Sequence, residues 1–311
     1  MIDQPNNIKQ IFHDLLDENG AAGERVHKLI NQHSHIKIYV GRTFPNKNLV
    51  LEIGSIKKSY LPLGFSKPSI KGLNVNFDYK QNGPKEDITL LLELQQSEAI
   101  DVFTIFVSRI CEVVDNLKDT ENAVKALFSL IDRWKDFFAS DSKILTQGQQ
   151  TGLYGELHLI SRLHNDGVSL SHLIKAWTGS KRTNQDFEFG DVSIEVKSTA
   201  AVDAKTVNIT NIRQLDTTGL KLLLLSRVLL DARQGYENTL PMLIEKLREE
   251  ITQQAPEARL DFEEKILLTK YRDDHSESYA HRTYAERELE FYRVRKGFPC
   301  LVESDLPSGV I

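Results

Sequence analysis

The stretch from Asp186 to Lys197 constrains the fold of this chain more than any other part of the sequence. Apolar and polar residues alternate on both sides of the dipeptide Gly190-Asp191. A Gly-Asp pair suits a two-residue hairpin turn, because glycine readily takes a positive φ at the first central position. The pattern therefore predicts a β-hairpin made of the runs 186–189 and 192–198.

Counting outward from that turn fixes which residues lie opposite each other. Phe189 is expected opposite Val192, and Phe187 opposite Ile194. Glu188 then falls opposite Ser193, and Asp186 opposite Glu195. Side chains alternate between the two faces of a strand, so one face is apolar and forms a core. The other face carries Asp186, Glu188, Ser193, Glu195 and Lys197.

Two carboxylates in one cross-strand pair indicate a cation site. Directly opposed residues have Cβ atoms about 4.5–5.5 Å apart, and carboxylates that close repel unless a positive charge lies between them. Mg²⁺ favours one or two carboxylates together with water and phosphate oxygens. Lys197, on the same face, could orient or deprotonate a water molecule. The alternative is an exposed hairpin with a charged outer face, because Glu-x-Lys alone is common.

A helix predicted over 149–163 carries a second unusual carboxylate. At about 100° per residue, Glu156 falls on the same broad face as Leu153, Leu157 and Ile160. A carboxylate on an apolar face costs several kcal/mol unless it is paired or binds a metal. Glu156 could therefore join the metal site, or form a structural ion pair, for instance with Lys197.

The residues that flank the hairpin supply further candidates. A third strand is predicted over 206–210, and Gln214 follows it. Asn208, Arg213 and Gln214 could reach a phosphate or a water molecule at the site. Lys181, Arg182 and Lys205 could bind a DNA backbone, or could equally be solvated surface residues.

Six short motifs follow one another along the chain: Arg133-Trp134, Gly152-Leu153-Tyr154-Gly155-Glu156-Leu157, Trp177-Thr178-Gly179, Gln185-Asp186-Phe187, Glu195-Val196-Lys197-Ser198 and Gln214-Leu215-Asp216. This ordered set resembles the PD-(D/E)XK nuclease superfamily. In particular, it resembles a bacterial family called "PD-(D/E)XK motif protein", which is found among restriction and phage-defence genes. One departure is Gln185, which stands where the motif has proline.

The resemblance implies a restriction-endonuclease-like, mixed-sheet αβββαβ core and Mg²⁺-dependent hydrolysis of DNA, with Mn²⁺ as a substitute. It assigns Asp186, Glu195, Val196 and Glu156 to the metal. Lys197 becomes the catalytic lysine and Glu156 an accessory acidic residue with a catalytic role. Apart from the resemblance, the positions in the sequence make Gln214 a candidate catalytic residue and make Lys181, Arg182, Lys205 and Arg213 candidate contacts to DNA.

The wider sequence predicts an α+β protein in three parts. Residues 1–140 are expected to form an N-terminal α+β domain for DNA or partner binding, and 141–256 the nuclease core. Residues 257–311 are expected to form an extension packed on that core. Between 36 and 80 lies a basic excess that could follow phosphates or form a solvated face: Lys37, Arg42, Lys47, Lys57, Lys58, Lys67, Lys71 and Lys80, against Glu52 and Asp78.

Bulk properties narrow the function classes. The formal net charge of -5 counts mildly against a general nucleic-acid binder. No apolar run is long enough to span a membrane, no secretory signal is visible, and the two cysteines lie far apart, as expected for a reducing cytoplasm. The apolar run 220–230 is too short to span a membrane and is expected to be a buried strand. No P-loop, H-E-x-x-H or G-x-G-x-x-G motif is present.

Two functions follow as expectations. The first is a Mg²⁺-dependent DNA endonuclease in a restriction or phage-defence system. It would act on double-stranded DNA, as a homodimer, with possible methyltransferase or ATPase subunits as partners. The alternative is an inactive DNA-binding or assembly subunit on the same fold. Near the C-terminus, Arg282, Arg287, Arg293, Arg295 and Lys296 mix with Tyr284, Phe291 and Tyr292 and could also contact DNA, although glutamates 286, 288 and 290 dilute the charge.

Overall fold

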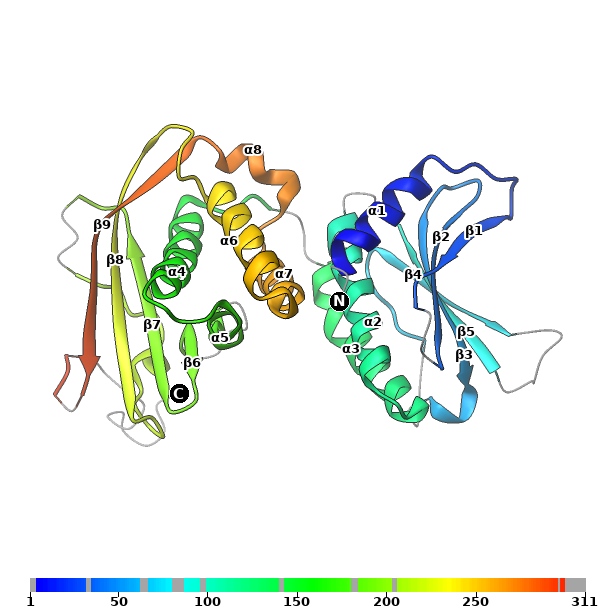
Figure 1. Ribbon diagram of the computed structural model, residues 1–311, viewed down its shortest axis with the longest axis horizontal. Coiled ribbons are helices and arrows are strands. Elements are labelled where there is room, and N and C mark those ends of the chain that lie inside the picture. The colour runs from blue at the N-terminus through cyan, green and yellow to red at the C-terminus, as the bar shows by residue number, and fades with distance from the viewer. Residues whose placement is uncertain are drawn as a thin grey trace. The chain divides into compact units, whose positions relative to one another are not determined.

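The computed structural model divides the chain into two compact units, Met1–Asp141 and Ser142–Ile311. It describes residues 4–31, 35–61, 67–79, 87–95, 99–139, 143–179, 184–202, 206–295 and 297–299. Each unit contains one β-sheet with helices against it (Figure 1). Among the described residues, no helix is both long and apolar enough to cross a membrane.

The first unit is an antiparallel sheet of five strands in the order β1-β2-β3-β5-β4. Helices α1, α2 and α3 lie along one face of it (Figure 1). The three helices contact one another through an aromatic cluster that includes Phe12, Phe103, Phe106 and Trp134. The elements are α1 (Gln4–Leu16), β1 (Arg25–Leu29), β2 (Lys37–Thr43), β3 (Leu49–Lys57), β4 (Leu73–Tyr79), β5 (Asp87–Leu94), α2 (Ile100–Asn116) and α3 (Thr120–Ala139).

One member of the basic segment in this unit has a structural role. Arg42 is only 7% exposed. Its guanidinium donates to the carbonyl oxygens of Leu15, Leu16 and Glu18 at the end of α1. Carbonyl groups at the C-terminal end of a helix are incompletely paired within the helix, and a cation there also complements the helix dipole. Arg42 therefore anchors α1 to the sheet and does not belong to a phosphate-binding surface.

The second unit carries a four-stranded mixed sheet in the order β6-β7-β8-β9. Strand β7 is antiparallel to β6 and parallel to β8, and β9 is antiparallel to β8. The elements are α4 (Gln147–Asn165), α5 (Leu170–Ala176), β6 (Phe187–Phe189), β7 (Val192–Thr199), η4 (Ile212–Leu215), β8 (Leu222–Gln234), α6 (Leu240–Gln254), α7 (Arg259–Leu268), α8 (Ser276–Tyr279) and β9 (Arg282–Val294).

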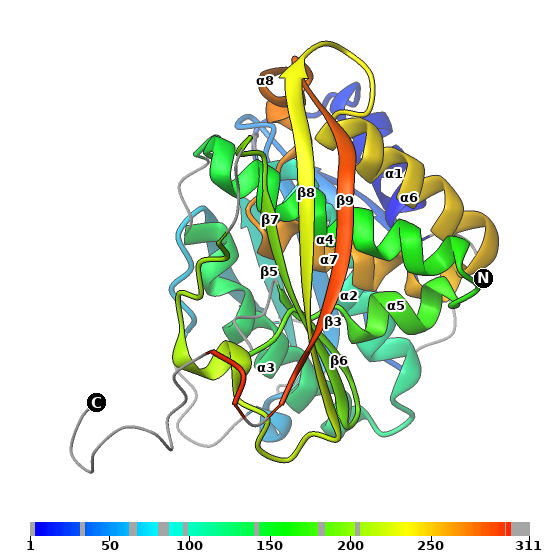
Figure 2. The same cartoon turned by 90° about the vertical axis from the view of Figure 1, so that its left-hand side faces the viewer.

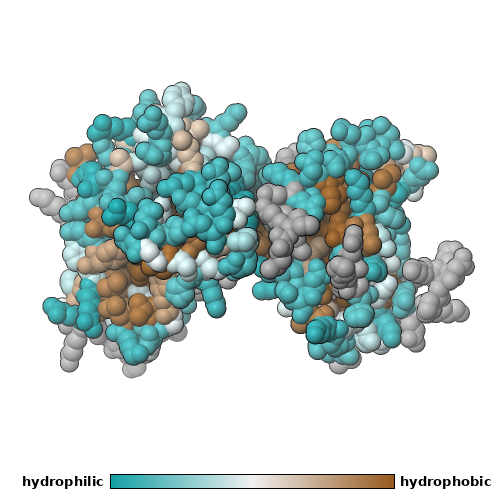
Figure 3. Space-filling view, viewed as in Figure 1, coloured by the Kyte–Doolittle hydropathy of each residue, from teal (hydrophilic) through white to brown (hydrophobic). Residues whose placement is uncertain are grey.

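Element order in this unit matches a PD-(D/E)XK-like fold. The series α4-β6-β7-β8-α6-β9 is the αβββαβ order, with α5, α7 and α8 as additions. The helices lie on one side of the sheet, which Figure 2 shows from the other side. The apolar side of α6, with Leu243, Ile244 and Leu247, packs into the core, while hydrophilic residues cover its visible side in Figure 3.

The strand predicted over 206–210 is absent, because these residues form no regular secondary structure. Val207 and Ile209 instead pack on Leu215, Leu223 and Leu225, on the sheet face away from the helices. The alternating apolar residues of this segment therefore pack on the sheet, and the segment does not pair with it as a strand. The third strand of the core is therefore β8, and the fourth, β9, comes from the segment expected to be an extension.

Glycine sets the close approach of α4 to β7. A Cβ atom built on Gly155 would lie 1.7 Å from Ser198 Oγ and 2.6 Å from Ser198 Cβ. A side chain of any size at 155 would therefore push the helix away from the strand that carries Glu195 and Lys197. The same helix contains Gly152, where an added Cβ meets no atom within 4 Å.

These two glycines form a matched pair for a stability test. We expect Gly155→Ala to lower the free energy of unfolding by about 1–3 kcal/mol through overpacking. Gly152→Ala should leave it unchanged or raise it by up to about 1 kcal/mol through helix propensity. Urea denaturation of both variants measures the difference. Equal effects of the two substitutions would contradict the close packing at Gly155.

Candidate functional site

The candidate site lies at the free edge of β7, where β6 has ended. The hairpin has the predicted register, with Phe187 opposite Ile194 and Phe189 opposite Val192, and Gly190 has a φ of +76°. Asp186 directly precedes β6. Its Oδ2 accepts a hydrogen bond from the backbone N–H of Val196 at 2.7 Å. The Asp186 carboxylate thus takes the place of the missing strand at this edge.

Glu195 and Lys197 point to the face of β7 that is opposite the core, as the alternation predicts. Glu195 is 1% exposed, and Lys197 Nζ lies 2.8 Å from its Oε1. That contact has the distance of an ion pair without the angles of a hydrogen bond. Among the described residues, neither carboxylate oxygen of Glu195 has a hydrogen-bond partner. A buried carboxylate in this state is poised to receive a further positive group.

Gln214 holds the lysine from the other side. Its Oε1 accepts from Lys197 Nζ at 3.1 Å and from the backbone N–H of Thr210 at 3.2 Å. The buried Gln185 side chain fixes this turn, because its Nε2 donates to the carbonyl oxygen of Arg213 at 3.0 Å. The residue that replaces proline in the motif therefore links Asp186 to the segment that carries Gln214.

Glu156 comes to the same place from α4. Its Oε2 accepts a hydrogen bond from Trp177 Nε1 at 2.7 Å. A Cβ on Gly179 would lie 2.7 Å from that Oε2 and 2.8 Å from Asp186 Oδ1. The two acidic groups therefore converge on a point that only glycine leaves open. Within the described residues, Glu156 is held by the indole and forms no ion pair with Lys197.

Burial makes these carboxylates hard to ionise. Desolvation, reinforced by the negative charge of Asp186, raises the pKa of Glu156 to about 8, although the Trp177 hydrogen bond opposes the shift. The same two causes raise the pKa of Glu195 to about 8, against the attraction of Lys197. Burial also raises the pKa of Asp186, and the Val196 N–H opposes it. Three carboxylates that resist ionisation together favour an added cation.

The remaining predicted site residues are placed as follows. The Val196 side chain is buried in the core, so only its backbone carbonyl could bind a metal. Arg213 and Asn208 are exposed. Lys181, Arg182 and Lys205 lie outside the described residues.

Sequence reasoning did not give a role to Trp177, Gly179 or Gln185, although all three occur in the quoted motifs. Trp177 is fully buried and Gln185 is 7% exposed. The signals in the sequence are the position of Gln185 directly before Asp186 and the presence of all three residues in the quoted motifs. Their roles depend on contacts between segments that are 20 to 30 residues apart, which local patterns do not reveal.

The donor set fits an oxygen-preferring divalent cation. Among the described residues, no three acidic, histidine or cysteine side chains form a ready-made metal cluster. Mg²⁺ does not require one, because it binds through one or two carboxylates and completes its shell with water and phosphate oxygens. Asp186 and Glu195 meet that requirement. The buried oxygens of Glu195 accept no hydrogen bond among the described residues, so they can still bind a cation beside Lys197.

The mixed-sheet core and its acidic edge define a PD-(D/E)XK-type protein. Over residues 8–311 the chain matches the model of the family described as "Putative PD-(D/E)XK family member, (DUF4420)", and it belongs to that family. No curated protein and no solved structure matches the chain. Family membership indicates nuclease chemistry, and PD-(D/E)XK nucleases in general use divalent metals.

The raised carboxylate pKa values predict how stability depends on pH without metal. Glu156 and Glu195 have pKa values of about 8 in the folded chain, against 4.5 as the ordinary value. The folded state therefore binds more protons than the unfolded state between these limits, and stability falls as pH rises through that window. Melting temperatures of Glu156→Gln and Glu195→Gln, measured in a chelator, should fall less steeply with pH than the wild type.

The exposed Glu188 on the same hairpin provides the control for this series. Glu188→Gln should keep the wild-type slope. Parallel slopes for all four proteins would show that the buried carboxylates do not control stability in this range.

Proposed function

We propose that this chain is a Mg²⁺-dependent endonuclease that cuts double-stranded DNA, with Mn²⁺ as a substitute. The observation that carries the proposal is the convergence of Asp186, Glu195 and Lys197 at the free edge of β7, with Glu156 arriving from α4.

In this proposal each residue has a distinct role. Asp186 and Glu195, with the carbonyl of Val196, hold the cation, and Glu156 is an accessory acid next to Asp186. When bound, the cation would stabilise negative charge on the phosphate and promote ionisation of a water molecule. As an ammonium, Lys197 orients that water; in its neutral form, Nζ takes up the proton of the water. Gln214 positions Nζ by accepting a hydrogen bond from it. Lys181, Arg182, Lys205 and Arg213 are proposed contacts to the DNA backbone.

The biological setting follows the same proposal. We infer a cytoplasmic component of a restriction or phage-defence system, active as a homodimer because a double-strand cut needs two active sites. Methyltransferase or ATPase subunits are the expected partners. Supporting this setting is the resemblance of the motifs to a restriction-associated family.

Plasmid cleavage tests the activity directly. Wild-type protein with Mg²⁺ or Mn²⁺ should nick or linearise supercoiled plasmid, and Asp186→Ala and Lys197→Ala should each lower the rate by at least about 100-fold, a typical loss for groups that act on the transition state. Arg233→Gln changes an exposed charge at the far end of β8 and should cut like the wild type.

Two other outcomes distinguish the alternatives. Metal-independent DNA binding with no cleavage, by wild type and variants alike, would favour a non-catalytic binding subunit on the same fold. Comparing plasmid from methylating and non-methylating hosts tests the restriction role, because a restriction enzyme should discriminate between them.

A further inference from the structure

The face of the second sheet opposite its helices carries a cation that the proposed catalytic set does not use. Along β8, Val228 and Leu230 enter the core beneath the helices. Because side chains alternate along a strand, Arg227 and Leu229 point to the opposite side, which we call the open face. Figure 2 looks onto that face, with the helices of the unit behind the sheet.

Arg227 is the direct neighbour of the proposed catalytic lysine. Strands β7 and β8 are parallel and in register, with Lys197 paired to Arg227 and Glu195 paired to Leu225. Paired residues on adjacent strands point to the same face, about 4.8 Å apart across the sheet. The side chains of Lys197 and Arg227 are 20% and 17% exposed. Their stems are thus covered, and their charged ends still reach solvent.

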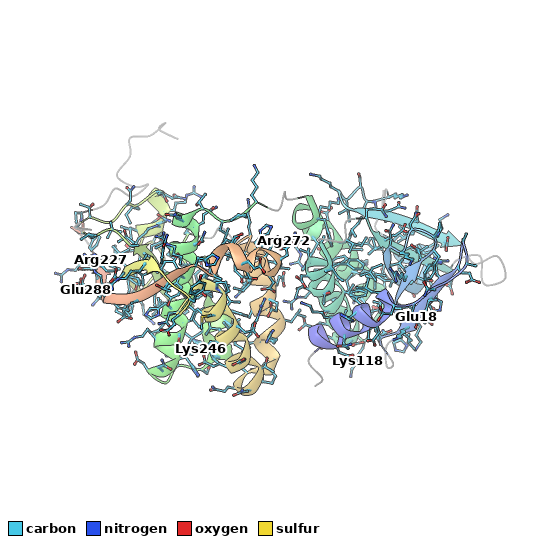
Figure 4. All side chains as sticks on the ribbon, turned by 90° about the horizontal axis from the view of Figure 1, so that it is seen from above. Glu18, Lys118, Arg227, Lys246, Arg272 and Glu288 are labelled. Carbon is cyan, nitrogen blue, oxygen red and sulfur yellow. The ribbon has the colours of Figure 1, made fainter. Side chains whose placement is uncertain are left out.

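In this structure, two carboxylates form ion pairs with the guanidinium of Arg227. It forms ion pairs with Glu290 and, at 3.6 Å, with Glu288, both on β9. Figure 4 labels Arg227 and Glu288. Tyr292 Oη also donates to Glu290 Oε2 at 2.5 Å. A guanidinium presents the same fork of donors to a carboxylate and to a phosphate, so these glutamates occupy the position that a phosphate group would take.

The partial exposure of Glu288 and Glu290 allows a phosphate group to replace them at Arg227. The side chains of Glu288 and Glu290 are 48% and 33% exposed. Because they are partly exposed, both glutamates can turn into solvent when released. The backbone of Arg227 stays in place, because it is paired on both sides within the sheet.

We propose that Arg227 binds a backbone phosphate of the DNA adjacent to the one at Lys197, and that Glu288 and Glu290 hold its guanidinium until DNA displaces them. This inference rests on the proposed function, since it takes DNA as the substrate. It adds a substrate-binding residue on β8, and it gives the two glutamates an opposing role that weakens DNA binding.

Fluorescence anisotropy with a labelled DNA duplex in a chelator tests the inference without cleavage. Arg227→Gln should weaken binding to duplexes of different sequence by a similar factor. The slope of log K against log salt concentration should fall by about one, the value for one lost phosphate contact. Arg227→Lys keeps the charge and should retain most of the slope. The matched control Arg233→Gln, an exposed arginine further along β8, should change neither quantity.

The glutamates provide a second and independent test. Glu290→Gln should strengthen DNA binding several-fold by releasing the guanidinium, and the same substitution should have a much smaller effect in an Arg227→Gln background. This coupling separates release of Arg227 from a general loss of negative charge.

The outcomes also separate this inference from the proposed function. Wild-type protein that binds and cuts DNA, with Arg227→Gln and Glu290→Gln binding as the wild type does, would overturn the role of Arg227 alone. Wild-type protein that neither binds nor cuts DNA would overturn the proposed function itself.

Discussion

The burial of neighbouring carboxylates is the constraint on which the site depends. Glu156, Asp186 and Glu195 come from a helix, a loop end and a strand. Burial pushes each toward its neutral form, and the negative charge of Asp186 adds to this effect on Glu156 and Glu195. A fold that buries three acids in one place stays stable only if hydrogen bonds or cations compensate. The protein offers Trp177 to one acid, a backbone N–H to another and Lys197 to the third.

The architecture around the acids explains why they converge at a strand edge. Strand β6 is only three residues long, so the second half of β7 has no strand partner on that side among the residues that the structure describes. Asp186 satisfies one of its backbone donors. Gly155 lets α4 approach β7 closely enough to bring Glu156 to that edge. The open face of the sheet continues from this edge across β8, where Arg227 extends the positive charge that starts at Lys197.

The sequence alone predicted the hairpin, its register and the polar set Asp186, Glu195 and Lys197, because a two-residue period and a glycine turn are local signals. It also marked Glu156 as an acid on an apolar helix face. It wrongly predicted a strand at 206–210, because alternation cannot distinguish pairing from packing on a sheet. The roles of Arg42 and Trp177 depend on contacts between distant segments, and local patterns do not reveal such contacts.

The central claim is that the acids at the β7 edge bind a divalent cation, and calorimetric titration of Mn²⁺ at pH 8 tests it most directly. Wild-type protein should bind the ion and release protons, because raised carboxylate pKa values leave protons to be displaced. Asp186→Asn and Glu195→Gln should each abolish or strongly weaken binding, while Glu188→Gln on the same hairpin should not. No binding by the wild type, or equal binding by all four proteins, would contradict the account.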